Sequence, residues 1–271
     1  MIIISYNRHL ILNFYMIIIS LILFTLTNLH ITLSLTLEYR IQNGYLAKPG
    51  EFPMIVLLLG ETHLCTGTII SRDKIITAGH CACGDSTYKV YANITNLNGR
   101  YSHFVQYREA LHAAYPIAYQ KQCNDLNAGL TDTQEQLGGS PDISIFTIDK
   151  PFNLINGYIE IGELEYDKPI SSGESVDVFV VGYGEDSTKK ATGQLRFGII
   201  KLSDCPKDIK IPTDRALCSN MNTNNQGPDI GDSGGPVFDN NGRVIGITSI
   251  AGNGWYVFSS IATHKQFIKI N

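Results

Sequence analysis

A serine near the C-terminal end has the neighbours that a nucleophile requires. Ser233 lies in the hexapeptide Gly-Asp-Ser-Gly-Gly-Pro over residues 231–236, in which glycines on both sides permit a tight turn. A serine that attacks a carbonyl needs such an exposed turn, with backbone N–H groups that stabilise the resulting oxyanion. Gly231 and Ser233 are the candidate donors. Taken alone, the hexapeptide is also compatible with a surface turn between two strands.

Two upstream residues have the chemistry that would activate this serine. His80 follows an apolar run and the tripeptide Thr-Ala-Gly, and Asp142 opens the alternating run Asp-Ile-Ser-Ile-Phe. An imidazole can take the hydroxyl proton, and a carboxylate can fix the imidazole tautomer. The sequence therefore predicts a His-Asp-Ser triad. Other acids lie near Asp142 without preceding such a strand: Asp125, Asp132 and Asp149.

With these motifs in this order, the chain from about Arg40 to its C-terminus resembles the trypsin and chymotrypsin family of serine proteases. The resemblance implies that His80 is the general base, that Asp142 orients it, and that Ser233 is the nucleophile. It also implies that Ser249 hydrogen-bonds to the buried aspartate. Polypeptide substrates and protein inhibitors are the implied partners, and no metal or organic cofactor is implied.

The family resemblance also predicts how the enzyme is activated. This family is cut after a basic residue, here Arg40, and the freed ammonium of Ile41 would then pair with Asp232. Breaking a buried ion pair typically costs about 3 to 5 kcal/mol, enough to hold the turn at Gly231 in its donor-inward form. An activating protease is therefore a further expected partner. The alternative is that Arg40 is an exposed linker residue.

The segment before Arg40 is typical of a secretory leader. Residues 16–24 are almost entirely apolar, and no charged residue lies between Arg8 and Glu38. We expect residues 1–40 to contain a signal peptide and a short activation segment, and residues 41–271 to form the protease domain. The product would be secreted, extracellular and free of the membrane. A retained signal anchor is the competing interpretation, and Met16 is an alternative start.

The cysteine count supports an oxidising compartment. Six cysteines accompany the leader, and sequence alone does not select their connectivity. A zinc site at Cys81-Ala82-Cys83 lacks a second pair of ligands. Asn93 begins an Asn-Ile-Thr glycosylation sequence. The resemblance implies the pairs Cys65 with Cys81 and Cys205 with Cys218, and it leaves Cys83 and Cys123 for each other.

Short β-like runs separated by Gly, Asn, Asp and Pro indicate an all-β protein. They cover residues 54–59, 88–91, 143–148, 176–181, 243–250 and 255–258, and only residues 262–270 have a helical pattern. The resemblance implies two packed six-stranded Greek-key barrels with the triad at their interface and a short C-terminal helix.

The net charge is −4 and no Lys/Arg run exists, so nucleic-acid binding is not expected. A monomer is expected.

The primary specificity pocket should lie beside the nucleophile. In this family the residue six positions before the serine forms the pocket floor, and here it is Gly227 rather than an acid, which disfavours cleavage after Lys or Arg. If Tyr256 lies on the pocket wall, its ring favours small apolar side chains; if it points away, the pocket stays open. Asp229, where the family has a cysteine, could instead attract a basic side chain. The other expected pocket residues are Pro228, Ile230, Ser249 and Ala251.

Two further departures from the family pattern are informative. Residues 120–140 form a polar, glycine-containing insertion, which we expect to be a surface loop pinned by Cys123. Gly79 replaces a usual alanine.

The main functional alternative is a protease-fold binding protein that keeps the triad without turnover. An esterase with the same triad would require a strand-to-helix setting for the serine that is not present here.

Overall fold

The computed structural model describes the part of the chain that the family resemblance covers. The described residues are 41, 44–83, 87–99, 103–127, 142–167, 175–185, 193–206, 216–221, 226–252 and 254–271. All of them belong to a compact unit that spans residues 39–271. The predicted leader, residues 1–40, lies outside the described residues. Within the described ranges, no helix has the length and apolarity needed to cross a membrane.

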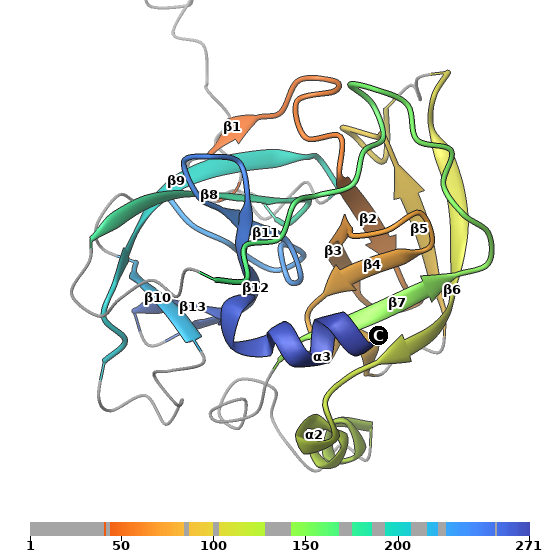
Figure 1. The fold of residues 1–271 in the computed structure, drawn as a ribbon. Helices are drawn as coiled ribbons and strands as arrows, with labels where there is room; N and C mark the ends of the chain where they lie inside the picture. Colours follow the sequence, from red (N-terminus) through yellow and green to blue (C-terminus); the bar gives the residue numbers. More distant parts are fainter. Residues whose placement is uncertain are drawn as a thin grey trace, which may run out of the picture. The chain divides into compact units, whose positions relative to one another are not determined.

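Six strands close the first barrel, which occupies the right side of Figure 1. In spatial order they are β2, β3, β4, β7, β6 and β5, and every pairing is antiparallel. β2 is buried along nearly its whole length, which is typical of a strand covered on both faces, whereas β5 alternates buried and more exposed residues, which is typical of a strand covered on one face. The strands are β2 (Ile55–Leu59), β3 (Leu64–Ile69), β4 (Lys74–Thr77), β5 (Tyr88–Ala92), β6 (Gln106–Ala114) and β7 (Ser144–Ile148).

The second barrel repeats this connectivity. Its ring follows the order β8, β9, β10, β13, β12, β11, and pairing between β11 and β8 closes it. A short strand, β1 (Tyr45–Leu46), pairs in antiparallel fashion with the start of β9. In both rings the fourth strand returns beside the first, so the two barrels share one topology. The strands are β8 (Val176–Gly182), β9 (Arg196–Ser203), β10 (Ala216–Asn220), β11 (Pro236–Phe238), β12 (Val244–Gly252) and β13 (Trp255–Ser260).

The C-terminal residues form the expected short helix. A 3-10 turn, η2 (Ala262–His264), leads into α3 (Lys265–Ile270), where Ile268 is buried. The prediction of an all-β protein with two six-stranded barrels and a C-terminal helix is confirmed.

A large hydrophobic cluster crosses the boundary between the barrels. It fills the first barrel and continues into Val181, Tyr183 and Ile247 of the second barrel's half of the chain. A second cluster fills the other barrel and includes Ile41. Because buried side chains are close-packed, the residues at this boundary are held in fixed positions relative to one another.

The insertion begins with a helix, so the prediction of a surface loop from residue 120 is wrong for its first part. α2 (Ile117–Asn127) contains no glycine or proline, and Pro116 precedes it at a position that favours helix initiation. Its exposed residues mix the apolar Ile117 with polar ones such as Gln120, Lys121 and Asn124, which hides the helical pattern in the sequence. Among the residues of α2 whose side chains the structure describes, Tyr119 and Cys123, one turn apart, are the buried ones. Residues 128–141 lie outside the described residues.

Candidate active site

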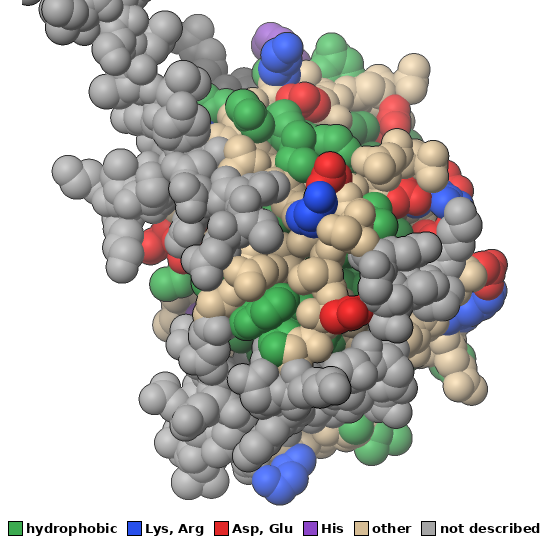
Figure 2. Space-filling model, turned by 90° about the vertical axis from the view of Figure 1, so that its left-hand side faces the viewer, with side chains coloured by type: hydrophobic (Ala, Val, Ile, Leu, Met, Phe, Trp, Pro, Cys, Tyr) green, Lys and Arg blue, Asp and Glu red, His purple; other side chains and the backbone are tan. Residues whose placement is uncertain are grey.

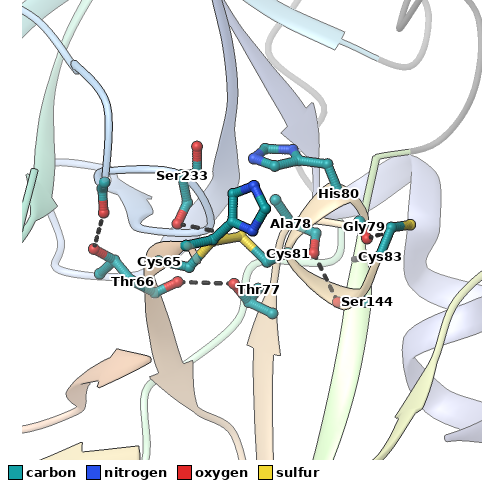
Figure 3. The surroundings of a disulfide bond; sticks show 12 residues. Cys65, Thr66, Thr77, Ala78, Gly79, His80, Cys81, Cys83, Ser144 and Ser233 are labelled. Carbon is teal, nitrogen blue, oxygen red and sulfur yellow. Dashed lines mark hydrogen bonds between the residues drawn. A yellow bond between two sulfur atoms is a disulfide. The ribbon is translucent and has the colours of Figure 1, made fainter. Parts of the chain in front are cut away.

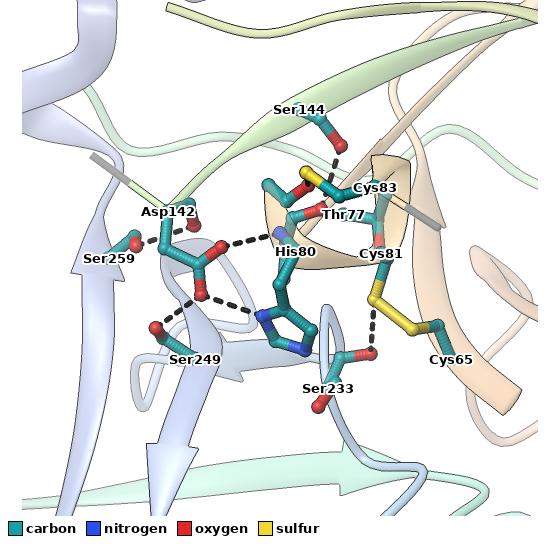
Figure 4. A network of polar contacts seen from close by, with 12 residues as sticks. Cys65, Thr77, His80, Cys81, Cys83, Asp142, Ser144, Ser233, Ser249 and Ser259 are labelled. Atoms are coloured by element: carbon teal, nitrogen blue, oxygen red, sulfur yellow. Dashed lines mark hydrogen bonds and ion pairs between the residues drawn. A yellow bond between two sulfur atoms is a disulfide. The ribbon is translucent and has the colours of Figure 1, made fainter. Parts of the chain in front are cut away.

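Neighbouring strands bring His80 and Asp142 together. His80 begins a 3-10 turn, η1 (His80–Ala82), shortly after β4, and Asp142 lies just before β7. β4 and β7 are antiparallel partners, with Thr77 opposite Ser144. The end of one strand therefore meets the start of the other, and the two side chains face each other in Figure 4. Asp149 is exposed beyond the opposite end of β7, Asp125 lies on the inserted helix α2, and Asp132 lies outside the described residues.

The Asp142 carboxylate accepts three hydrogen bonds. His80 Nδ1 lies 2.9 Å from Oδ2, and the His80 backbone N–H donates to Oδ1 over 2.7 Å. Ser249 Oγ donates to Oδ2 over 2.5 Å, from β12 of the other barrel (Figure 4). With Nδ1–H directed at the carboxylate, the other imidazole nitrogen, Nε2, is left as the acceptor that a general base needs.

Burial and charge shift both members of this pair. The Asp142 side chain is 3% exposed and the His80 side chain 22%. Burial opposes the charged imidazolium, but the charge of Asp142 and the hydrogen bond from Nδ1 raise the pKa of His80 above its usual 6.5. Burial alone would raise the pKa of Asp142, yet His80 and the bonds from Ser249 and the backbone lower it. Asp142 is therefore ionised, and it stabilises positive charge on His80.

The turn that contains Ser233 is joined to the first barrel. The Ser233 carbonyl accepts a hydrogen bond from the Thr66 N–H over 2.8 Å, and the Thr66 hydroxyl donates to the Gly231 carbonyl over 3.0 Å. Gly234 has φ 81°, and a Cβ there would lie 1.9 Å from Thr77 Oγ1. Only glycine fits this approach of the turn to the first barrel.

Ser233 and His80 lie in the same neighbourhood. A His80 ring nitrogen is within 4.8 Å of the sulfur of Cys81, and that sulfur is 3.8 Å from the Ser233 carbonyl oxygen. No hydrogen bond joins Ser233 Oγ to the imidazole in Figure 4. Within the part of the chain that the structure describes, the N–H groups of Gly231 and Ser233 donate no hydrogen bond to another backbone group. Both remain available as the predicted oxyanion donors.

Three disulfides join the six cysteines in the pairs that the resemblance implies. Cys65–Cys81 links β3 to η1 beside His80 (Figure 3). The sulfurs of this pair are the donors that lie close enough to His80 for a shared metal ion among the described residues. Because they form a disulfide, they offer no thiolates to a metal. The other pairs are Cys83–Cys123 and Cys205–Cys218.

Asp232, the residue before Ser233, is a buried carboxylate held by backbone amides. It is 1% exposed, and it accepts backbone N–H bonds from Gly184 over 2.7 Å and from Asp229 over 2.9 Å. Burial raises the pKa of Asp232 to about 7, although these bonds and the charge of Arg196 oppose the shift. The Ile41 side chain is buried in the core of the second barrel. Arg40 lies outside the described residues.

Arg196 approaches Asp232 across a strand ladder. It is the largest of the fully buried side chains and lies opposite Gly182 in the β8–β9 pairing. A Cβ at Gly182 would lie 2.2 Å from Asp232 Oδ1, so the carboxylate occupies the missing side chain's place. Opposite residues of an antiparallel pair project to the same face. The guanidinium side chain and the carboxylate are therefore on one face of the sheet.

At the predicted pocket floor, the Tyr256 ring covers Gly227. A Cβ at Gly227 would lie 2.1 Å from two ring carbons of Tyr256, which is 2% exposed. Burial raises the pKa of Tyr256 to about 12, with the charges of Asp229 and Asp232 adding to the shift. The remaining expected pocket residues are Pro228, which is buried, Ile230, which is 69% exposed, and Ala251, which pairs with Tyr256 between β12 and β13.

Tyr119 lies beside the candidate triad, although no motif in the sequence points to it. Its side chain on α2 is fully buried and reaches Gly79, next to His80. A signal for it was present, because Gly79 stands where the family usually has alanine, and the smaller residue makes room.

Comparison with known proteins identifies the family. Residues 41–265 match the family model described as Trypsin. The chain belongs to the trypsin family. Cercarial protease of Schistosoma mansoni is 29% identical over 205 residues, which cover 74% of this chain and 75% of that protein. Lectizyme of Glossina austeni is 30% identical over 227 residues, which cover 78% and 76%.

A solved structure shows the same fold at lower identity. The structure of human heparin binding protein aligns with a TM-score of 0.68 at 20% identity, over 84% of this chain and 95% of the other. This structure supports the fold alone. The family model and the protease relatives assign the chain to the serine-type endopeptidases.

Proposed function

We propose that residues 41–271 form the catalytic domain of a secreted serine endopeptidase that hydrolyses polypeptides through Ser233, His80 and Asp142. The observation that carries the proposal is the buried Asp142 carboxylate, which holds His80 Nδ1 at 2.9 Å and is itself fixed by Ser249. This arrangement prepares Nε2 to accept a proton. The Ser233 turn is anchored to the same barrel boundary through Thr66.

In the proposed reaction, His80 Nε2 takes the Ser233 hydroxyl proton as Oγ attacks the substrate carbonyl. The N–H groups of Gly231 and Ser233 stabilise the oxyanion, and Asp142 stabilises the imidazolium. His80 then gives its proton to the leaving amine, which departs and leaves an acyl-enzyme at Ser233. His80 then takes a proton from a water molecule that attacks the ester, and it returns this proton to Ser233 Oγ as the carboxylic acid product departs.

Activation is proposed to follow a cut between Arg40 and Ile41 by another protease. In the intact chain Asp232 is buried and forms no ion pair within the described residues, and its pKa is about 7. A new ammonium at Ile41 would supply the missing charge. The position of the Ile41 side chain in the second barrel's core favours this, because it already lies inside the barrel that contains Asp232.

Primary specificity is proposed to be for a small or apolar side chain. No acid occupies the floor position, and the Tyr256 ring covers Gly227 there. A long basic side chain would therefore meet an aromatic ring instead of a carboxylate. Asp229 is the residue that could reverse this preference, so strong cleavage after Lys or Arg would contradict the proposal.

Secretion is proposed from the apolar leader and from the cysteines, since no free cysteine occurs among the described residues. Asn93, part-exposed with φ 60°, is the proposed glycosylation site. Protein inhibitors are proposed partners, and the enzyme is proposed to act as a monomer free of the membrane.

Labelling by a fluorophosphonate before and after a controlled cut at Arg40 tests this function, with Ser233→Ala as the control. Labelling that appears on cleavage and is absent in the variant is the expected result. Absence of labelling in a preparation shown to begin at Ile41 would contradict it and would favour the non-catalytic binding protein.

A further inference from the structure

Helix α2 brings a buried tyrosine to the side of the candidate triad. Tyr119 is fully buried on this helix, and Cys123, one turn later, is bonded to Cys83. Cys83 follows directly on η1, which begins at His80. The disulfide therefore fastens the helix to the turn that carries the imidazole. Tyr119 forms a small buried cluster with these two cysteines, against which Tyr115 and Ile250 pack.

Gly79 provides the space in which Tyr119 lies. A Cβ at residue 79 would lie 2.9 Å from Tyr119 Cε1 and 3.0 Å from Asp142 Oδ1. The backbone of Gly79 has φ −64° and ψ −41°, which alanine adopts freely. The glycine is therefore required by space and not by conformation. The Tyr119 ring and the Asp142 carboxylate would both be in close contact with the methyl group of an alanine at position 79.

The Tyr119 hydroxyl has a charged acceptor nearby. It is buried, and within the described residues it has no hydrogen-bond partner of ordinary geometry. Burial raises the pKa of Tyr119 far above its usual value, and the neighbouring Asp142 charge and an interaction with that carboxylate raise it further. A buried hydroxyl without a partner is costly. Asp142 Oδ1 accepts one hydrogen bond, from the His80 N–H, and has capacity for another.

We propose that Tyr119 is a positioning residue of this enzyme, whose hydroxyl donates a further hydrogen bond to the Asp142 carboxylate and fixes the orientation in which Asp142 holds His80. The inference rests on the proposed function, because it gives the inserted helix a part in the proposed triad. It also explains two departures from the family pattern together, the insertion that begins with α2 and the glycine at position 79.

The bond would moderate the effect of Asp142 on His80. A donor to the carboxylate stabilises its negative charge and weakens its attraction for a proton on the imidazole. Removing the donor should therefore raise the pKa of His80. It should also loosen the carboxylate, which lowers kcat because the orientation of the base matters in the transition state and not for substrate binding.

Tyr119→Phe tests the hydroxyl while keeping the ring. The matched control is Tyr115→Phe, because the Tyr115 ring packs edge-on against the Tyr119 ring, with 6.3 Å between the ring centroids. In the activated enzyme we expect Tyr119→Phe to lower kcat about tenfold with KM changed less than about twofold. The acid limb of the kcat/KM profile should move to higher pH. Tyr115→Phe should leave both unchanged, and an equal effect of the two variants would overturn the proposal.

A second readout does not depend on turnover. NMR titration of His80 in the Ser233→Ala background should give a higher pKa when Tyr119→Phe is added. An unchanged His80 pKa would overturn the proposal for Tyr119, whether or not the activated chain reacts with a fluorophosphonate. If the activated chain is not labelled but the His80 pKa still rises in the Tyr119→Phe variant, the proposed function is contradicted and the role of Tyr119 is not.

Gly79→Ala tests the spatial argument. We expect it to lower the melting temperature when residue 119 is tyrosine, and to lower it less in a Tyr119→Ala background, where the ring is absent. Additive effects of the two substitutions would show that Gly79 does not make room for Tyr119 and would remove this support.

Discussion

Asp142 shows how single residues determine the chemistry of the candidate site. A buried carboxylate is costly unless it is hydrogen-bonded, and here donors from both halves of the protein meet it: the His80 side chain and backbone, and Ser249. Ser259 also donates to the Asp142 backbone carbonyl over 2.7 Å. The orientation of the imidazole is therefore determined by residues distant in sequence.

Asp142→Asn should lower kcat by about 10³- to 10⁴-fold, with a much smaller effect on KM. The amide can still occupy the space, but its NH₂ group would favour the imidazole tautomer that has its proton on Nε2, which cannot accept the Ser233 proton. Steady-state kinetics of the activated variant provide the measurement. A loss smaller than about tenfold would show that Asp142 is not the orienting residue.

The raised pKa of His80 predicts the acid limb of activity. The base must be neutral to accept a proton, so activity is lost as pH falls through the pKa of His80, which lies above 6.5. The pH profile of kcat/KM for a neutral peptide substrate should therefore have an acid midpoint above 6.5. A midpoint below that value would contradict the electrostatic role given to Asp142.

Close approaches between strands and turns define the site at the scale of elements. Asp232 reaches into the β8–β9 ladder beside Gly182, and the Tyr256 ring of β13 covers Gly227. In both places a glycine leaves the space that a side chain from another element fills. A larger residue at either position would displace the element that carries the candidate machinery.

The intact chain should lose stability as pH rises from 3.8 to about 7. The folded Asp232 has its pKa raised from 3.8 to about 7, so in this window it holds a proton that the unfolded chain has released. Cleavage at Arg40 should reduce this slope, because the proposed Ile41 ammonium would stabilise the ionised carboxylate. Melting temperatures of intact and cut Ser233→Ala protein across this range provide the test.

Asp232→Asn is the control for this prediction, since it should reduce the slope in the intact chain without cleavage. Equal slopes for intact and cut protein would contradict the pairing of Ile41 with Asp232.

Gly227→Ala should destabilise the protein by about 1 to 3 kcal/mol, because the added methyl group overlaps the Tyr256 ring. Tyr256→Ala in the same chain should relieve part of this cost. Denaturant unfolding of the single and double variants measures the coupling. If Gly227→Ala is neutral, the ring does not fill the floor of the pocket.

How far the sequence predicts these elements depends on their patterns. The apolar or alternating runs at 54–59 and 176–181 correspond to β2 and β8 within a residue of each boundary. β6 was not predicted, because a register shift between Ala110 and His112 breaks its alternation. α2 was not predicted, because its exposed residues mix apolar and polar types without a helical period. The triad residues have strong local motifs, whereas Tyr119 and the position of the Tyr256 ring depend on packing between distant segments.

At the scale of the whole molecule, the candidate triad exists only where the barrels meet. His80 and Asp142 belong to the first barrel's half of the chain, and Ser233 and Ser249 belong to the second. The face shown in Figure 2 has basic side chains scattered among acidic and apolar ones, with no basic patch visible there.

Gly234→Ala should disturb that boundary. Its Cβ would lie 1.9 Å from Thr77 Oγ1 and 2.4 Å from the Thr66 carbonyl oxygen, and φ is 81°. We expect a loss of stability of more than about 1 kcal/mol and loss of fluorophosphonate labelling in the cut protein. A cut variant that labels at the wild-type rate would show that the turn does not depend on this contact.

The pairing of β1 with β9 has a consequence for the kinetics of activation. Residue 41 lies four residues before Tyr45, which the ladder holds against Phe197. Four residues reach at most about 14 Å, so a new amino group at Ile41 remains close to the barrel that contains Asp232. A short tether gives a local concentration on the order of millimolar or higher. Once Arg40 is cut, insertion of Ile41 should be a first-order event whose rate does not depend on enzyme concentration.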